Sequence, residues 1–143
     1  MLIPEREVAK TVQVAYRSSM EKSHGVIVVI EDDEAIRESM FDLLSMEGYT
    51  VLGFSNGQEA MNGLDALTNP CLILLDWMMP VMDGAEFLQA RQSLQGPAKS
   101  APVIVVSAVA GKIADAPTAS GFLRKPLDLD VLLDIVAKHC PAK

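Results

Sequence analysis

The stretch that decides the fold occupies residues 72–84 and reads Leu-Ile-Leu-Leu-Asp-Trp-Met-Met-Pro-Val-Met-Asp-Gly. Its first four residues are aliphatic, which is typical of a strand buried on both faces of a sheet. The run places the carboxylate of Asp76 at the carboxyl end of that strand, where open α/β sheets bind their ligands. Pro80 and Gly84 then open a turn. The stretch therefore predicts a functional carboxylate at the mouth of a loop, outside the core.

A second apolar run, residues 26–30, ends in Glu31, Asp32, Asp33 and Glu34. Parallel strands that end in acids would bring those acids together at one edge of the sheet. Carboxylates about 4 Å apart repel by roughly 4 kcal/mol at an effective dielectric of about 20, so such a cluster needs a cation or a raised pKa. A small, oxygen-only ligand set suits Mg²⁺. For Asp33 and Glu34 a solvated helix N-terminus is the competing interpretation.

Length and composition predict one domain with a full core, because half of the 143 residues are hydrophobic. The formal net charge of −7 argues against a nucleic-acid-binding surface on this chain. No apolar run is long enough to span a membrane, and we expect a cytoplasmic protein. Cys71 and Cys140 lack the spacing of a metal site, so we interpret Cys71 as a small core residue in a reducing environment.

From residue 26 onward the sequence alternates between strand and helix patterns. Strands are expected at 26–30, 50–54, 72–75, 103–106 and 122–123, with helices near 34–48, after 57, from 84 to about 96 and from 128. This alternation is typical of parallel β/α units with right-handed crossovers. The predicted fold class is α/β, a flavodoxin-like (βα)5 three-layer sandwich with a five-stranded parallel sheet.

The first 24 residues have a different composition from the rest. They are mostly polar, with Val8, Val12, Ala15 and Tyr16 at helical spacing. We interpret residues 1–24 as an N-terminal arm, weakly ordered or forming a short helix, that is available to dock a partner.

The predicted strands share one property, which is a polar side chain at the carboxyl end. Glu31 and Asp32 follow the first strand, Asp76 the third, Ser107 the fourth and Lys125 the fifth. A lone serine there is usually a cap and a lone Lys-Pro usually a turn. Together, three carboxylates, a hydroxyl and an ammonium suit phosphoryl transfer, because a cation neutralises the acids and one carboxylate attacks.

These motifs give the chain a resemblance to the receiver (CheY-like) domain of two-component response regulators. The resemblance covers about residues 26–139 and implies a receiver domain at 25–143. It rests on four motifs in the same order as in the family, which read Val-Ile-Glu-Asp-Asp-Glu-Ala-Ile-Arg-Glu, Leu-Leu-Asp-Trp-Met-Met-Pro-Val-Met-Asp-Gly, Pro-Val-Ile-Val-Val-Ser-Ala and Gly-Phe-Leu-Arg-Lys-Pro-Leu-Asp.

The resemblance implies a phosphoacceptor and a magnesium site. Asp76 would accept the phosphoryl group from a partner histidine kinase or phosphotransfer protein. Asp32 would bind Mg²⁺ directly, Glu31 would bind it through water, and the backbone carbonyl of Met78 would complete the protein ligands. Glu31 stands where many members of the family carry aspartate.

The resemblance also implies a switch. Ser107 would be the hydroxyl that turns toward the phosphoryl group, Phe122 the aromatic residue that follows it, and Lys125 the lysine that pairs with the phosphate. The Lys125-Pro126 bond would be cis. The domain would then change conformation and signal to a downstream protein that the sequence does not identify.

The chain departs from the family between Ser107 and Lys125, where its connection is shorter than usual. Gly111 and Pro117 are both unfavourable in a regular helix. We therefore predict that helix 4 of the family fold is shortened or irregular here.

Two other functions compete with that of a phosphoacceptor. A Mg²⁺-dependent hydrolase with an aspartyl nucleophile would carry a second aspartate two residues after it, but Met78 stands at that position. A receiver-like interaction scaffold would have lost the chemistry, whereas here each required side chain is present. We therefore expect no turnover of a separate substrate, and neither nucleic acid nor membrane as a direct partner.

Overall fold

The fold is built around a parallel sheet, seen in a computed structural model that describes residues 25–108 and 119–141. The strands are β1 (Val26–Ile30), β2 (Thr50–Phe54), β3 (Pro70–Asp76), β4 (Val103–Ser107) and β5 (Gly121–Arg124). Within the described residues they form one sheet of order β2-β1-β3-β4-β5, and every pairing is parallel. The predicted five-stranded parallel sheet is confirmed, with β3 at its centre.

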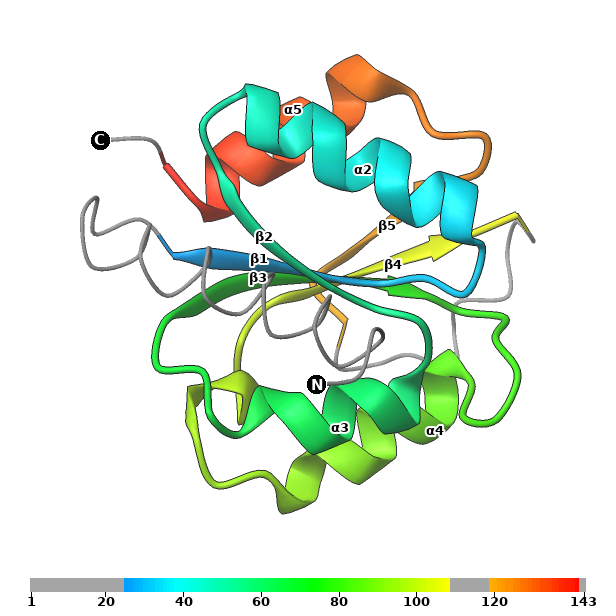
Figure 1. Cartoon of the computed structure of the whole chain (residues 1–143), viewed down its shortest axis with the longest axis vertical. Helices are drawn as coiled ribbons and strands as arrows, with labels where there is room; N and C mark the ends of the chain where they lie inside the picture. The colour runs from blue at the N-terminus through cyan, green and yellow to red at the C-terminus, as the bar shows by residue number, and fades with distance from the viewer. Residues whose placement is uncertain (1–24, 109–118, 142–143) are drawn as a thin grey trace, which may run out of the picture.

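Helices cover both faces of this sheet. They are α2 (Glu34–Met46), α3 (Gly57–Leu64), α4 (Gly84–Ala90) and α5 (Leu129–His139). Figure 1 shows α2 and α5 on one face of the sheet and α3 and α4 on the other, which confirms the three-layer sandwich. No helix in the described ranges is both long enough and apolar enough to cross a membrane.

The aliphatic runs of the central strands supply two cores, one under each helical layer. Val28, Ile30, Ile73 and Leu75 belong to the core that also contains residues of α3 and α4. Their sequence neighbours Ile27, Val29, Leu72 and Leu74 belong to the core that contains residues of α2 and α5. Because side chains alternate between the faces of a strand, a strand covered on both faces must be apolar throughout.

Each α-helix begins at a side-chain cap close to the carboxyl edge of the sheet. Asp33, Asn56, Asp83 and Asp128 cap α2, α3, α4 and α5, and Asp83 forms a full capping box with Glu86. Asp33 accepts a hydrogen bond from the Ile36 amide at 3.0 Å. The helix N-terminus interpretation of Asp33 is therefore confirmed.

The helix after β3 ends earlier than predicted. It stops at Ala90, and two 3₁₀ turns, Arg91–Ser93 and Pro97–Lys99, replace the expected continuation toward residue 96. Arg91 directly follows the helix, and its buried Nη1 donates to the carbonyl oxygens of Ala98 at 3.2 Å and Ala101 at 3.0 Å. The returning segment packs around this guanidinium because a buried cation needs acceptors.

Cys71 packs against the core under α2 and α5, as predicted, but the prediction that it is reduced is wrong. Cys71, near the start of β3, forms a disulfide with Cys140, directly after α5, with 5.6 Å between their Cα atoms. The two residues lie 69 positions apart in the sequence. Spacing alone could not pair them, because the contact exists only once α5 has packed along the sheet.

Two of the sequence-based expectations concern residues outside the described ranges. The N-terminal arm at 1–24 is one, and the shortened helix 4 is the other, since its segment centres on residues 109–118. Both stay predictions.

One residue in the loop after β3 has an unfavourable backbone conformation. Val81 has a φ of 69°, and the Met82 amide donates to the Pro80 carbonyl at 2.7 Å, as in a γ-turn. A β-branched residue is strained there by about 1–2 kcal/mol. Its side chain is 78% exposed and therefore contributes little packing.

We expect Val81→Gly to raise the free energy of unfolding by about 0.5–1 kcal/mol, because relief of the strain exceeds the added chain entropy of glycine. Urea denaturation measures this. Val81→Ala is the matched control, since it keeps the Cβ that causes the strain and should give no comparable gain. An equal gain in both variants would refute the strain argument.

Candidate functional site: an acidic cluster with a lysine

The polar residues predicted to converge lie at one edge of the sheet. Asp76 is the last residue of β3, which lies between β1 and β4. Glu31 directly follows β1, Ser107 ends β4 and Lys125 directly follows β5. Residues from four separate segments are thus brought together by the parallel arrangement of the strands.

Three carboxylates form the centre of the site. Glu31, Asp32 and Asp76 each offer an oxygen, and these oxygens lie within 4.8 Å of one another. Asp32 is exposed, whereas Glu31 is 2% and Asp76 only 4% exposed. Asp76 is therefore more enclosed than the expected position at a loop mouth, because it is still paired within the sheet, opposite Val106.

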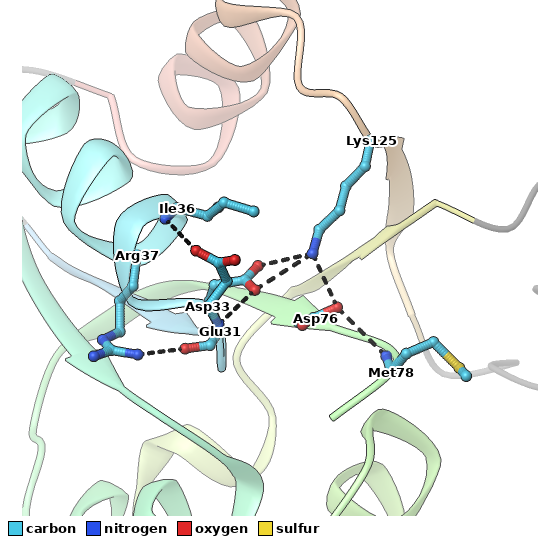
Figure 2. A network of polar contacts seen from close by, with 7 residues as sticks. All are labelled: Glu31, Asp33, Ile36, Arg37, Asp76, Met78 and Lys125. Carbon is cyan, nitrogen blue, oxygen red and sulfur yellow. Dashed lines mark hydrogen bonds and ion pairs between the residues drawn. The ribbon is translucent and has the colours of Figure 1, made fainter. Parts of the chain in front are cut away.

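Lys125 is the cation that faces Glu31 and Asp76 (Figure 2). Its Nζ lies 3.1 Å from Glu31 Oε1 and 3.4 Å from Asp76 Oδ1. Nζ also donates to Glu31 Oε2 at 3.4 Å. The peptide bond between Lys125 and Pro126 is cis, as the resemblance implied. One ammonium thus links the acid after β1 to the acid at the end of β3.

Arg37 in α2 also contributes to the site, although it was not among the predicted site residues. Its Nη1 donates to the backbone carbonyl of Glu31 at 2.8 Å, while the Glu31 amide donates to the Phe54 carbonyl at 3.0 Å. The Asp33 amide donates to Glu31 Oε2 at 3.1 Å. Figure 2 shows that Arg37 reaches back from the first turns of α2 to the loop before it. The feature of the sequence that could have indicated this contact is the position of Arg37, four residues and therefore about one helical turn after the Asp33 cap.

The loop after β3 is held close to Asp76. The Met78 amide donates to Asp76 Oδ1 at 3.4 Å, and the Trp77 amide donates to the Val106 carbonyl at 3.0 Å. Gly84 is required beside Trp77, because a Cβ at that position would lie 2.5 Å from the indole. The assignment of the Met78 carbonyl as a metal ligand stays a prediction.

Burial and charge shift the ionisation of both central residues. Burial, with a hydrogen bond to Asp32 and the charge of Glu31, raises the pKa of Asp76 to about 7, although Lys125 opposes the shift. For Lys125, burial alone would lower the pKa. The charges of Asp76 and Glu31 and the hydrogen bonds to them outweigh burial, so the pKa of Lys125 is raised.

The geometry fits a small divalent cation. Among the buried side-chain nitrogen and oxygen atoms in the described part of the chain, Asp76 Oδ2 is the one without a hydrogen-bond partner. A buried carboxylate oxygen without a partner is costly, and the Asp76 carboxylate lies beside those of Glu31 and Asp32. A hard cation with oxygen ligands, such as Mg²⁺, would satisfy this atom and offset the repulsion among the acids.

The two predicted switch residues occupy the neighbouring strands. Ser107 is 5% exposed and lies one register position beyond Val106, the partner of Asp76. Phe122 in β5 pairs with Val105 of β4 and is 42% exposed. Their positions agree with the resemblance, and their roles stay predictions.

Comparison with known families gives a match over most of the chain. A family model described as the response regulator receiver domain matches residues 27–137. Response regulator MprA from Mycolicibacterium vanbaalenii is 36% identical over 111 residues, covering 75% of this chain and 46% of that protein. The Mycobacterium tuberculosis protein of the same name gives the same values. The chain therefore spans about half the length of these curated relatives.

Solved structures agree with these matches. The response regulator TrrA from Thermotoga maritima, in complex with Mg²⁺ and BeF, is 28% identical, with a TM-score of 0.69 over 80% of this chain and 97% of that one. The receiver domain of Francisella response regulator 1452 is 25% identical, with a TM-score of 0.70 over 80% of this chain and 94% of that one.

Proposed function

Because the chain belongs to the response regulator receiver domain family of two-component signalling, we propose that Asp76 accepts a phosphoryl group. The donor is a histidine kinase or a phosphotransfer protein, and the reaction depends on Mg²⁺. The phosphorylated domain then changes conformation and signals to a downstream protein. The observation that carries the proposal is the Asp76 carboxylate, which lies among two further carboxylates and the Lys125 ammonium and has a buried oxygen, Oδ2, without a hydrogen-bond partner.

The proposed reaction is an in-line displacement at phosphorus. A carboxylate oxygen of Asp76 attacks the phosphoryl group of a phosphohistidine, so an O–P bond forms as the P–N bond breaks. The imidazole leaves with the electron pair and takes up a proton. Lys125 pairs with the phosphoryl oxygens, since its Nζ already lies 3.4 Å from Asp76 Oδ1.

Asp76 must be ionised to attack. Its pKa of about 7 means that near neutral pH a large fraction is protonated in the metal-free protein. We propose that Asp32 and Asp76 bind Mg²⁺ directly, with Glu31 acting through water and Met78 through its carbonyl. When bound, Mg²⁺ supplies positive charge that favours the carboxylate form and neutralises phosphoryl oxygens.

The proposed switch follows from the charge that phosphorylation adds. An aspartyl phosphate carries close to two negative charges in place of the single charge of the carboxylate, and it brings three acceptor oxygens. Ser107 turns toward these oxygens from the end of β4, and Phe122 moves into the space that Ser107 vacates. Phe122 can move because its side chain is half-exposed rather than locked in the core.

A groove beside the site offers a surface for the phosphodonor. It has a volume of about 300 Å³ and lies between α2 and the segment after β5. Its lining is mostly apolar and includes Ile36, Met40, Leu43, Pro126 and Leu127, together with Lys125. An apolar surface that reaches the site lysine suits a helical partner presenting its phosphohistidine to Asp76.

We propose that the domain works in the cytoplasm, where the donor's phosphohistidine is formed. We also propose that this stretch of chain has protein partners rather than nucleic acid or membrane, because its net charge is −7. A hydrolase that turns over a separate substrate is disfavoured, because Met78 offers no acid or base two residues after Asp76.

Intact mass after incubation with Mg²⁺ and acetyl phosphate tests the proposal. We expect wild type to gain one phosphate in a Mg²⁺-dependent manner and Asp76→Asn to gain none. Asp83→Asn is the matched control, because Asp83 lies in the same loop but caps α4, a role that asparagine also fills. It should label as wild type does.

Two results would contradict the proposal. Labelling that persists in Asp76→Asn would place the acceptor elsewhere. The second is no labelling of wild type together with no effect of Mg²⁺ on Trp77 fluorescence, which would favour the interaction scaffold.

A further inference from the structure

The Cys71–Cys140 disulfide lies outside the acidic site and joins β3 to the end of α5, two elements that share the apolar core between them. Cys71 is near the amino end of β3, and Cys140 directly follows α5. Asp76 is at the opposite end of β3, roughly 16 Å away at the usual rise of a strand. The sulfurs therefore have no part in the proposed phosphoryl chemistry.

The surroundings keep the two sulfurs together. Cys140 is 4% exposed and belongs to the core under α2 and α5, where Leu132 and Val136 of α5 are fully buried. Gly25 leaves room for Cys71, since a Cβ there would lie 2.4 Å from the Cys71 Cβ and 2.8 Å from its sulfur. Cys71 itself is only partly buried, which leaves an approach for a small thiol.

We propose that Cys71 and Cys140 form a reversible redox clamp that sets the stability of this domain. Under reducing conditions both are thiols, and α5 is held by its apolar face alone. Under oxidising conditions a low-molecular-weight disulfide such as oxidised glutathione is the oxidant. One cysteine thiolate attacks it and releases one glutathione thiol, and the second cysteine then displaces the other. The chain gains one S–S bond, and two glutathione thiols take up its two protons.

The clamp acts through chain entropy. Closing a loop between residues 69 positions apart restricts the unfolded chain far more than the folded one. In the folded protein the cysteines are already within bonding reach, with Cα atoms 5.6 Å apart, inside the usual range for disulfides. Oxidation should therefore raise the thermal midpoint by about 10 °C for a chain of this size.

The test compares the wild-type chain in excess oxidised glutathione with the same chain in dithiothreitol. Mass spectrometry after alkylation counts free thiols, and a thermal melt gives the midpoint. We expect no free thiols and a midpoint about 10 °C higher after oxidation, both reversed by dithiothreitol. Cys140→Ser should show a single midpoint, close to that of the reduced wild type, in both buffers.

Three results would each overturn the clamp. Two free thiols in oxidised glutathione would show that the pair does not close. A disulfide that survives excess reduced glutathione would make it a permanent bond rather than a reversible one. Equal midpoints for oxidised and reduced wild type would show that closure has no effect on stability. The wild-type comparison needs no substitution, so it stands even where Cys140→Ser folds poorly.

Discussion

Asp76→Asn should raise the free energy of unfolding of the metal-free protein. This increase should itself grow with pH, by up to about 4 kcal/mol between pH 4 and pH 8. The folded-state pKa of Asp76 is about 7, against 3.8 for an ordinary aspartate. Folded protein therefore holds a proton at pH values where the unfolded chain has released it. The resulting stability is fully present below about pH 4 and is lost as the pH rises to about 7.

Urea denaturation of wild type and Asp76→Asn in a chelating buffer, from pH 4 to 8, measures this difference. The difference between the two proteins isolates Asp76 from the other carboxylates, which both proteins share. A difference that stays constant over the range would show that Asp76 ionises in the folded protein as it does in the unfolded chain. Addition of Mg²⁺ at pH 8 should recover stability in wild type and less in the variant.

Lys125→Met should lower the free energy of unfolding by about 3 kcal/mol at pH 8 without Mg²⁺, because it leaves buried carboxylates without their cation. Lys125 is the ion-pair partner of both Glu31 and Asp76, which are 2% and 4% exposed. Methionine keeps most of the length and apolar surface of lysine, so the loss reports on charge rather than on packing.

Lys138→Met is the matched control, since this lysine is exposed in the last turn of α5 and should cost only about 0.5 kcal/mol. Mg²⁺ should restore much of the stability of Lys125→Met, because a bound cation replaces the missing charge. A loss for Lys125→Met as small as that of the control would show that the acids do not depend on the lysine.

The sequence was sufficient for the sheet and for the convergence of the acids and Lys125 at one edge of it. The aliphatic runs of β1, β3 and β4 reveal strands covered on both faces, because only such strands need apolar side chains at every position. Parallel strands have all their carboxyl ends at one edge, so Asp76, Ser107 and Lys125 could be placed together without coordinates. The helix caps at Asp33 and Asp83 are local features of the sequence, since each capping carboxylate accepts from an amide three residues later.

Only the tertiary structure determined the features that depend on contacts between residues far apart in the sequence or on how deeply a group is buried. Cys71 and Cys140 meet because α5 packs along the sheet, and Arg91 is buried because the segment at Ala98 and Ala101 folds back over it. The raised pKa of Asp76 depends on burial and on Glu31 and Lys125, which lie far from it in the chain. Periodicity and strand order determine which residues share an edge or a face. Distances, burial and charge environment arise only when the layers pack, and these decide the ionisation of Asp76 and the pairing of the cysteines.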